Sequence, residues 1–316
     1  MMASIEGASR MLFVAVAVWV HIGASLAADP GAFVGRWDLT IAHGETSRPA
    51  WMEIRQDRGA LAVSFVGPYG GAEPARGVQL TNGRLTFSTE DYFGHEAAMR
   101  VEFTIEGDGL TGAVTREHEK FALSGKRAPR LGAVDNPKWG RRIVLFNGTN
   151  LDGWRFDQPT RSGNWAAENG LLICRGRGSN IVTAQEFRDF RLHVEFNCPA
   201  DGNSGVYLRG RYEVQIEDDE RKSPPTSWLG GIYGFLAPET VVRRPGEWRS
   251  FDITLLGRTV SVSVDGQPVI RRREIPGITG GALDSNEDLP GPIYLQGDHG
   301  GLTFRRIEIT PAIGGR

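Results

Sequence analysis

The sequence predicts an all-β protein in which a small antiparallel barrel or meander precedes a jelly-roll β-sandwich. Apolar and polar residues alternate with period two through most of the chain, and no long stretch keeps the 3.6-residue apolar period of a helix. The 316 residues include 42 glycines and 17 prolines, which suit a chain broken by many tight turns. A chain of this length has room for two domains.

The first 27 residues have the features of an export signal. Arg10 gives a positive flank, residues 11–20 form an uninterrupted apolar run, and residues 25–27 provide small side chains at the two positions that a signal peptidase reads. The apolar run is too short to cross a bilayer as a helix. We therefore expect a cleavable signal peptide over residues 1–27, a periplasmic or secreted location, and no membrane anchor in the mature chain.

Residues 30–126 are expected to form the antiparallel barrel or meander. Eight short alternating runs follow one another, and turn signals such as residues 58–59 (Arg-Gly) and 82–83 (Asn-Gly) favour tight hairpins between them. The sequence Gly-Arg-Trp at 35–37 resembles the Gly-x-Trp start of lipocalin-like barrels. Because no cluster of titratable residues stands out in this segment, we expect it to have an accessory role.

A linker and a second β unit follow. Residues 127–140 contain two prolines and scattered charges without periodicity, which is typical of a linker. Apolar and polar residues alternate again with period two over residues 141–316. Asp265-Gly266, between two alternating runs, predicts a two-residue hairpin loop. Ten or more strands in one segment favour a β-sandwich of jelly-roll type.

Charge and cysteine content exclude several classes of protein. The 36 Lys and Arg residues nearly balance the 38 Asp and Glu residues, so no overall basic field indicates a nucleic-acid partner. Two cysteines are too few for a disulfide scaffold or a Cys-rich zinc site. In an exported protein Cys174 and Cys198 could pair, but both lie in strand-like runs, and buried free thiols explain them equally well.

Polar residues alternate with apolar residues in four strand-like runs, 190–197, 205–210, 212–218 and 292–297, and so lie opposite the core. The polar positions are Arg191, His193, Glu195, Asn197, Tyr207, Arg209, Glu213, Gln215, Glu217, Tyr294 and Gln296, and Asp298 and His299 follow in a turn. A solvated strand face is the ordinary explanation for such rows. These rows contain almost no lysine and many side chains that bind sugar hydroxyls or transfer protons, so we expect a sugar-binding cleft.

Searches for other catalytic motifs narrow the choice. The His-Glu pairs at 95–96 and 118–119 lack the second histidine of a zinc protease. The glycines at 176 and 178 lack the third glycine of a dinucleotide-binding loop, and residues 202–206 lack the last glycine of a nucleophile elbow. Metalloprotease, NAD enzyme and serine hydrolase are therefore disfavoured.

Six motifs of the C-terminal segment occur together in one order. They are LFNGTNLDGW (145–154), GNSGVYLRGRYEVQIEDD (202–219), GGIYG (230–234), PGEWRSFDI (245–253), VDGQPV (264–269) and LQGDHGGLTFRRIEI (295–309). With these motifs the segment 142–311 resembles the 3-keto-disaccharide (3-keto-glycoside) hydrolase domain family. The resemblance implies a concanavalin-A-like jelly-roll sandwich and a small carbohydrate substrate, a glycoside oxidised at C3. It does not extend to the N-terminal segment.

A ketone at C3 acidifies the C2 hydrogen, so such a reaction needs a base near C2, a group that stabilises the enolate oxygen and an acid for the leaving oxygen. His299 is expected to act as base or acid, with Glu213 and Glu195 as candidates for the second proton carrier. Substrate binding is assigned to Asn203, Arg209, Gln215, Tyr233, Gln296 and Asp298. The ordinary alternatives are that His299 only caps its loop and that either glutamate pairs with Arg209.

The sequence leaves other hypotheses on cofactor and function open. Four acids, Glu217, Asp218, Glu287 and Asp298, could bind a divalent cation or form a surface acid cluster, so no cofactor is certain. A non-catalytic, lectin-like protein is the main alternative to an enzyme. A conventional retaining glycoside hydrolase would need two carboxylates about 5 Å apart, an arrangement that the sequence does not require. The aglycone, the oligomeric state and any contact between the two units are not specified.

Overall fold

The computed structural model describes residues 29–89, 98–132, 135–200, 202–217, 224–241 and 244–314, and the all-β prediction is confirmed within them. The expected signal peptide lies outside these ranges. The helical elements of the described part are three short 3₁₀ turns, Pro30–Ala32, Pro159–Arg161 and Pro225–Ser227. None of the described helices is long and apolar enough to cross a membrane.

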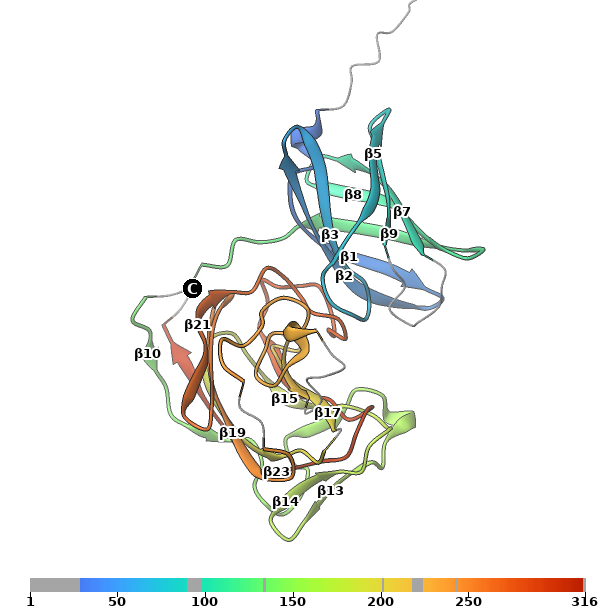
Figure 1. Ribbon diagram of the computed structural model, residues 1–316. Coiled ribbons are helices and arrows are strands. Elements are labelled where there is room, and N and C mark those ends of the chain that lie inside the picture. The colour runs from blue at the N-terminus through green and yellow to red at the C-terminus, as the bar shows by residue number, and fades with distance from the viewer. Residues whose placement is uncertain are drawn as a thin grey trace, which may run out of the picture.

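Nine strands of the N-terminal unit form one antiparallel sheet, here called the N-terminal sheet, in the order β4-β3-β2-β1-β9-β8-β7-β6-β5. Their bounds are β1 Gly35–His43, β2 Thr46–Asp57, β3 Ala60–Val66, β4 Glu73–Pro74, β5 Arg76–Thr81, β6 Arg84–Thr89, β7 Met99–Glu106, β8 Gly109–Arg116 and β9 Glu119–Arg127. Because β3 also contacts β5, the sheet curls into a nearly closed barrel (Figure 1). Asn82 and Gly83 both adopt positive φ in the β5–β6 hairpin, as their sequence predicts.

The C-terminal unit is a sandwich of two sheets. The long sheet has the order β13-β14-β23-β16-β19-β20-β21, with β10 and β11 pairing to β23, and the five-stranded sheet has the order β12-β15-β22-β17-β18. The long sheet contains β10 Lys138–Trp139, β11 Ile143–Val144, β13 Trp165–Glu168, β14 Leu171–Cys174, β16 Phe190–Asn197, β19 Trp248–Leu256, β20 Thr259–Val264, β21 Gln267–Glu274 and β23 Leu302–Ile313. The five-stranded sheet contains β12 Trp154–Phe156, β15 Ile181–Phe187, β17 Asn203–Leu208, β18 Tyr212–Glu217 and β22 Gly291–Leu295.

The alternation of β16, β17, β18 and β22 sets the two faces of the sandwich, because successive side chains of a strand point to opposite sides. The apolar positions Phe190, Leu192, Val194, Phe196, Val206, Leu208, Tyr212, Val214, Ile216, Ile293 and Leu295 all lie in one buried cluster between the sheets. The opposite side of the five-stranded sheet, here called the polar face, carries Asn203, Tyr207, Glu213, Gln215, Tyr294 and Gln296. This face holds the candidate site.

The barrel and the sandwich contact each other directly. Trp51 of β2 is fully buried and belongs to the hydrophobic cluster of the sandwich rather than to that of the barrel. Its ring meets the edge of Phe235 with 5.3 Å between centroids, and a Cβ on Gly277 would lie 2.1 Å from its indole nitrogen. A large aromatic side chain of one unit is thus packed into the core of the other.

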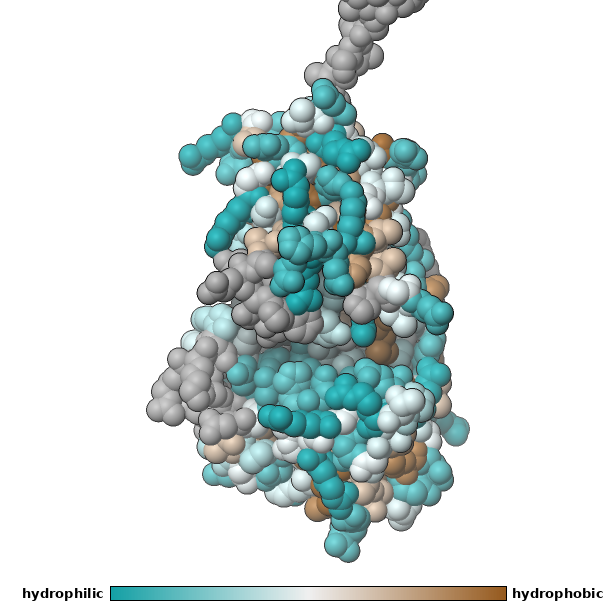
Figure 2. Space-filling view, turned by 90° about the vertical axis from the view of Figure 1, so that its right-hand side faces the viewer, coloured by the Kyte–Doolittle hydropathy of each residue, from teal (hydrophilic) through white to brown (hydrophobic). Residues whose placement is uncertain are grey.

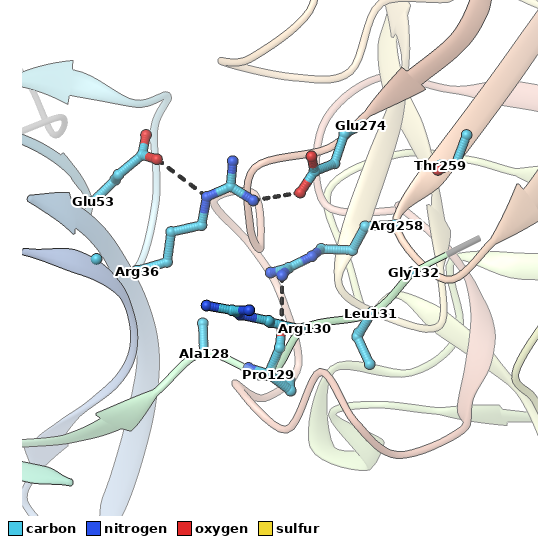
Figure 3. Close-up of a pocket in the computed structure, with 11 residues that line it drawn as sticks. Arg36, Glu53, Ala128, Pro129, Arg130, Leu131, Gly132, Arg258, Thr259 and Glu274 are labelled. Atoms are coloured by element: carbon cyan, nitrogen blue, oxygen red, sulfur yellow. Dashed lines mark hydrogen bonds and ion pairs between the residues drawn. The ribbon is translucent and has the colours of Figure 1, made fainter. Parts of the chain in front are cut away.

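A pocket of about 480 Å³ lies where the barrel meets the sandwich, lined by β1, the segment 128–132, and strands β20 and β21 (Figure 3). Arg36 bridges the two units there by pairing with Glu53 of β2 and Glu274 of β21. None of the predicted site residues lines this pocket. On the surface seen in Figure 2, hydrophilic residues predominate and hydrophobic ones are scattered.

Candidate active site

Three residues lie at the centre of the polar face. β17 pairs with β18 so that Tyr207 is opposite Glu213, and it pairs with β22 so that Tyr207 is also opposite Tyr294. The two tyrosine rings stack with 4.2 Å between centroids and 11° between planes. The centre of the face is therefore an aromatic pair with a carboxyl group beside it.

Glu213 is only 3% exposed, and its Oε2 lies 2.8 Å from the Tyr207 hydroxyl, within hydrogen-bond distance. Burial is the main cause that raises the pKa of Glu213 to about 8; the Tyr207 hydrogen bond opposes the shift, and the charges of Asp298 and Glu217 add to it. At neutral pH the carboxyl group therefore keeps its proton. A buried, protonated carboxyl group is suited to general-acid catalysis.

The surroundings of Tyr207 agree with a protonated Glu213. The Tyr207 hydroxyl is 2.8 Å from the Glu213 carboxyl group and 2.9 Å from the backbone oxygen of Gly280, but it has a single proton to donate. A proton on Glu213 allows both bonds to form, because Glu213 then donates to Tyr207 and Tyr207 donates to Gly280. An ionised Glu213 would leave one of the two acceptors without a proton.

The amide groups of the polar face supply further hydrogen-bonding capacity. Gln215 is 2% exposed and donates from Nε2 to Oδ1 of Asn203 over 3.2 Å. Within the described part of the chain, the buried Oε1 atoms of Gln215 and Gln296 have no hydrogen-bond partner. Buried polar atoms nearly always have partners, so these two oxygens are available to accept hydrogen bonds from the hydroxyl groups of a ligand.

His299 and Asp298 lie in the turn after β22, at the open end of this face. His299 Nδ1 is 2.7 Å from Asp298 Oδ1, and this hydrogen bond is the main cause that raises the pKa of His299 above 6.5. The His299 side chain is 48% exposed, and the charge of Glu217 also favours its protonation. When Nδ1–H bonds to Asp298, Nε2 carries the free lone pair that a general base needs.

Tyr233 reaches the site on a loop that extends the edge of β18. The backbone nitrogen of Tyr233 donates to the oxygen of Glu213 over 3.1 Å, and that of Gly230 donates to the oxygen of Gln215 over 2.9 Å. The loop therefore follows β18 as a short extra edge. Six predicted residues join Glu213 at this face or its border: His299, Asn203, Gln215, Tyr233, Gln296 and Asp298.

The structure corrects two of the predicted positions. Glu195 lies on β16 of the long sheet, where it pairs with Arg305 and His193, so it does not share a sheet with Glu213. Arg209 is buried beside the core, where it donates to the Gly257 oxygen and the Tyr212 hydroxyl. Arg209 has a φ of 56° in the turn after β17, so the alternation of the strand no longer sets its direction.

Sequence reasoning placed Tyr207 and Tyr294 on this face but gave them no role, and it missed the residues that hold the His299 turn. Asn180 Oδ1 accepts from the Gly297 nitrogen over 2.8 Å, and Asn164 Nδ2 donates to the Gly297 oxygen over 2.9 Å. These asparagines come from loops next to β15 and β13. Loop residues carry no periodic signal, so their proximity to Gly297 could not be read from the sequence.

The geometry gives less support to a divalent-cation site. Glu287 pairs with Arg258 at 2.6 Å and accepts from Tyr212, so it does not join Asp298 in one cluster, and Asp218 lies outside the described residues. No group of three or more His, Cys, Asp or Glu side chains in the described ranges is arranged to hold a metal ion. Cys174 and Cys198 are both buried thiols and do not form a disulfide with each other.

Residues 141–310, more than half of the chain, match the family of 3-keto-alpha-glucoside-1,2-lyase-like domains. The chain belongs to this family. The family named from the sequence motifs is thereby confirmed. The barrel precedes the matched residues, whereas Asn203, Glu213, Gln296 and His299 all lie within the lyase-like domain.

Individual relatives cover the lyase-like domain to different extents. The 3-keto-disaccharide hydrolase of Bacteroides thetaiotaomicron is 26% identical over 88 residues, which span 25% of this chain and 30% of that protein. A candidate glycosyl hydrolase from Parabacteroides distasonis is 26% identical, with 57% of this chain and 93% of that chain covered and a TM-score of 0.46. The laminarinase catalytic domain from Thermotoga petrophila is 14% identical, with 57% and 100% covered and a TM-score of 0.35.

Proposed function

We propose that this protein is a carbohydrate-active enzyme that cleaves glycosides oxidised at C3 of the sugar. The observation that carries the proposal is the polar face, where the carboxyl group of Glu213 is held protonated and the His299–Asp298 pair lies at the open end. The free amide oxygens of Gln215 and Gln296 suit the hydroxyl groups of a neutral sugar. Membership of the lyase-like family supports the same class of substrate.

The proposed reaction is an elimination. Neutral His299 removes the C2 proton through Nε2, and the electron pair of the broken C–H bond moves into the C2–C3 bond to give an enolate at the C3 oxygen. Amide N–H groups of the polar face stabilise that oxygen. The enolate then expels the C1 substituent as the C1–O bond breaks, and Glu213 gives its proton to the leaving oxygen.

The elimination gives an unsaturated 3-keto sugar and the free aglycone. Addition of water across the new C1–C2 double bond restores a saturated 3-keto sugar, so the net result is hydrolysis. Each step leaves the atoms and charges balanced, because the proton that His299 takes is returned at C2 and the proton that Glu213 gives is replaced by one from water.

The test compares release of an aglycone from a glucoside and from its 3-keto form by the purified protein. Release from the keto form alone supports the proposal, release from the plain glucoside supports a conventional glycoside hydrolase, and binding without release supports a lectin. His299→Ala and Glu213→Gln should each lower the rate of release by about 10²-fold or more without unfolding the protein. Glu195→Gln is the matched control and should keep full activity, because Glu195 lies on the long sheet.

We also propose that the enzyme is exported and starts near Ala28. The positive flank, the apolar run and the small residues at 25–27 support this, although these residues lie outside the described ranges. Expression of the full chain in a bacterium, followed by mass spectrometry of the periplasmic protein, tests the proposal. A product that retains residues 1–27 in the cytoplasm would contradict it.

A further inference from the structure

The barrel loop 67–72, between β3 and β4, contacts both loops that border the polar face. The Gly281 nitrogen donates to the Pro68 oxygen over 2.9 Å, and the Ala72 nitrogen approaches the Gly234 oxygen at 3.4 Å. Gly281 follows Gly280, which accepts from Tyr207, and Gly234 follows Tyr233. One loop of the barrel therefore contacts the site from two sides.

Glycines make these contacts unusually close. A Cβ on Gly280 would lie 2.4 Å from the Gly70 oxygen, and a Cβ on Gly234 would lie 2.3 Å from the Gly71 Cα. Real Cβ atoms do not approach other atoms so closely, so the two backbones pack in a way that only glycine permits. The barrel loop is thus fitted against the loops of the sandwich.

A short chain of contacts connects the barrel to the proposed acid. Gly70 packs on Gly280, the Gly280 oxygen accepts from the Tyr207 hydroxyl, and that hydroxyl is 2.8 Å from Glu213. Displacement of Gly280 would free Tyr207 to donate fully to an ionised Glu213. The position of the barrel loop therefore influences the protonation of the carboxyl group.

Tyr69 is the aromatic residue of the barrel loop, and its backbone packs on Gly280, where a Cβ would lie 2.8 Å from the Tyr69 carbonyl carbon. The Arg48 guanidinium lies over the Tyr69 ring, 5.8 Å from its centroid, and Tyr69 is partly exposed. Burial is the main cause of the raised pKa of Tyr294, and nearby groups that include the Tyr69 phenol raise it further. Because the Tyr69 backbone packs on Gly280, and Gly280 accepts from the Tyr207 hydroxyl, Tyr69 lies beside the stacked Tyr207–Tyr294 pair. Aromatic walls of this kind are common in small-molecule sites.

We propose that the barrel completes the sugar site: the loop 67–72 positions Tyr207 through Gly280, and Tyr69 forms part of the wall that the sugar contacts. The proposal rests on the proposed function of the polar face. It assigns the N-terminal unit to the active site rather than to a separate binding role. Tyr69 is then a substrate-binding residue and Gly280 a positioning residue.

The wall role is tested with Tyr69→Ala and Tyr69→Phe in the full chain, with kcat and KM measured on the 3-keto glycoside. We expect Tyr69→Ala to raise KM about tenfold with kcat nearly unchanged, and Tyr69→Phe to raise KM much less because the ring is kept. A KM within twofold of the parent in Tyr69→Ala would overturn the wall role.

The positioning role is tested without substrate. Infrared spectra recorded over a pH series follow the protonated carboxyl group of Glu213, which is assigned by its loss in Glu213→Gln. We expect Gly280→Ala to lower the pH of deprotonation by about one unit. Gly132→Ala is the matched control, because a Cβ there would meet no atom within 4 Å.

An unchanged Glu213 titration in Gly280→Ala would overturn the positioning role. If Gly280→Ala does not fold, Gly234→Ala displaces the same barrel loop at Gly71, from its other side, with the same expected shift. Absence of turnover by the parent enzyme would instead count against the proposed function, and the infrared comparison would still decide whether the barrel positions the Tyr207–Glu213 pair.

Discussion

Two glutamates with similar sequence surroundings have opposite chemical properties in the fold. Glu213 is buried beside a tyrosine, and its pKa rises to about 8. Burial also raises the pKa of Glu195, but hydrogen bonds from Arg305 and His193 outweigh it, so its pKa lies below the usual value. Glu195 therefore remains ionised and cannot donate a proton near pH 7. Of these two glutamates, Glu213 has the properties of the acid that the proposed reaction needs.

The pH dependence of the reaction should follow the titration of His299 and of Glu213. We expect kcat/KM to rise with pH as His299 loses its proton, at a pH above 6.5, and to fall as Glu213 ionises near pH 8. The result is a narrow bell in a plot of kcat/KM against pH. Glu213→Gln should lower kcat by about 10²-fold or more and should remove the alkaline limb of the remaining activity.

The same pKa shift has a consequence for folding. Because the folded state holds the Glu213 proton more tightly than the unfolded state, the stabilisation is complete below the unfolded pKa of about 4.5 and is lost as pH rises towards 8. Glu213→Gln should therefore make the free energy of unfolding less dependent on pH in this window.

For the reaction itself, a kcat/KM profile that stays flat between pH 6 and pH 9 would contradict the assignment of both His299 and Glu213.

At the scale of the strands, alternation was enough to predict which side chains face the core. It assigned Tyr212, Val214 and Ile216 to the core correctly, because β18 keeps a regular pleat along its length. Alternation gives a face within one strand but does not say which sheet the strand joins. For this reason the sequence could not show that Glu195, on β16, belongs to a different sheet from Glu213, on β18.

The close packing of β17 on β18 can be tested at Gly205. A Cβ at this position would lie 2.1 Å from Oε1 of Glu213, so Gly205→Ala must push the carboxyl group away from its place beside Tyr207. We expect activity to fall about 10²-fold, as for loss of a general acid. Overpacking should also lower the free energy of unfolding by about 1–3 kcal/mol. Kinetics and urea unfolding measure the two effects.

Gly109→Ala is the control for this substitution, because a Cβ at that strand position would have ordinary contacts at 3.6 Å. It should leave activity unchanged. Full activity in a folded Gly205→Ala protein would show that the position of the Glu213 carboxyl group does not matter for the reaction.

At the scale of the whole molecule, the contact between barrel and sandwich could not be predicted from the sequence. Tyr69 and Gly280 are more than 200 residues apart, and both lie in loops that have no hydrophobic period. The motifs of the lyase-like domain all lie in the sandwich, so they give no information on the barrel. Because the sequence has no motif that links the barrel to the site, it predicts only an accessory role for the N-terminal segment.

A buried acid in the interface gives a last prediction on how the two units are held together. Asp38 of β1 is 2% exposed, and in the described part of the chain neither of its carboxylate oxygens has a hydrogen-bond partner. The charges of Arg258 and Glu287 of the sandwich both act on it. Burial is the main cause that raises the pKa of Asp38 to about 8, and the charge of Glu287 adds to the shift. Ionised Asp38 therefore destabilises the assembled molecule.

Because the folded pKa lies above the unfolded value of about 4, the contribution of Asp38 to stability should be fully present below pH 4 and should be lost as pH rises to about 8. Asp38→Asn removes the charge and keeps the shape, so it should stabilise the protein by about 1–3 kcal/mol at pH 8.5 and by little at pH 4.5. Urea unfolding at the two pH values measures the difference. The exposed Asp57→Asn is the control and should show no such gain. If Asp38→Asn and the parent lose stability equally between these pH values, Asp38 is not the group that weakens the interface.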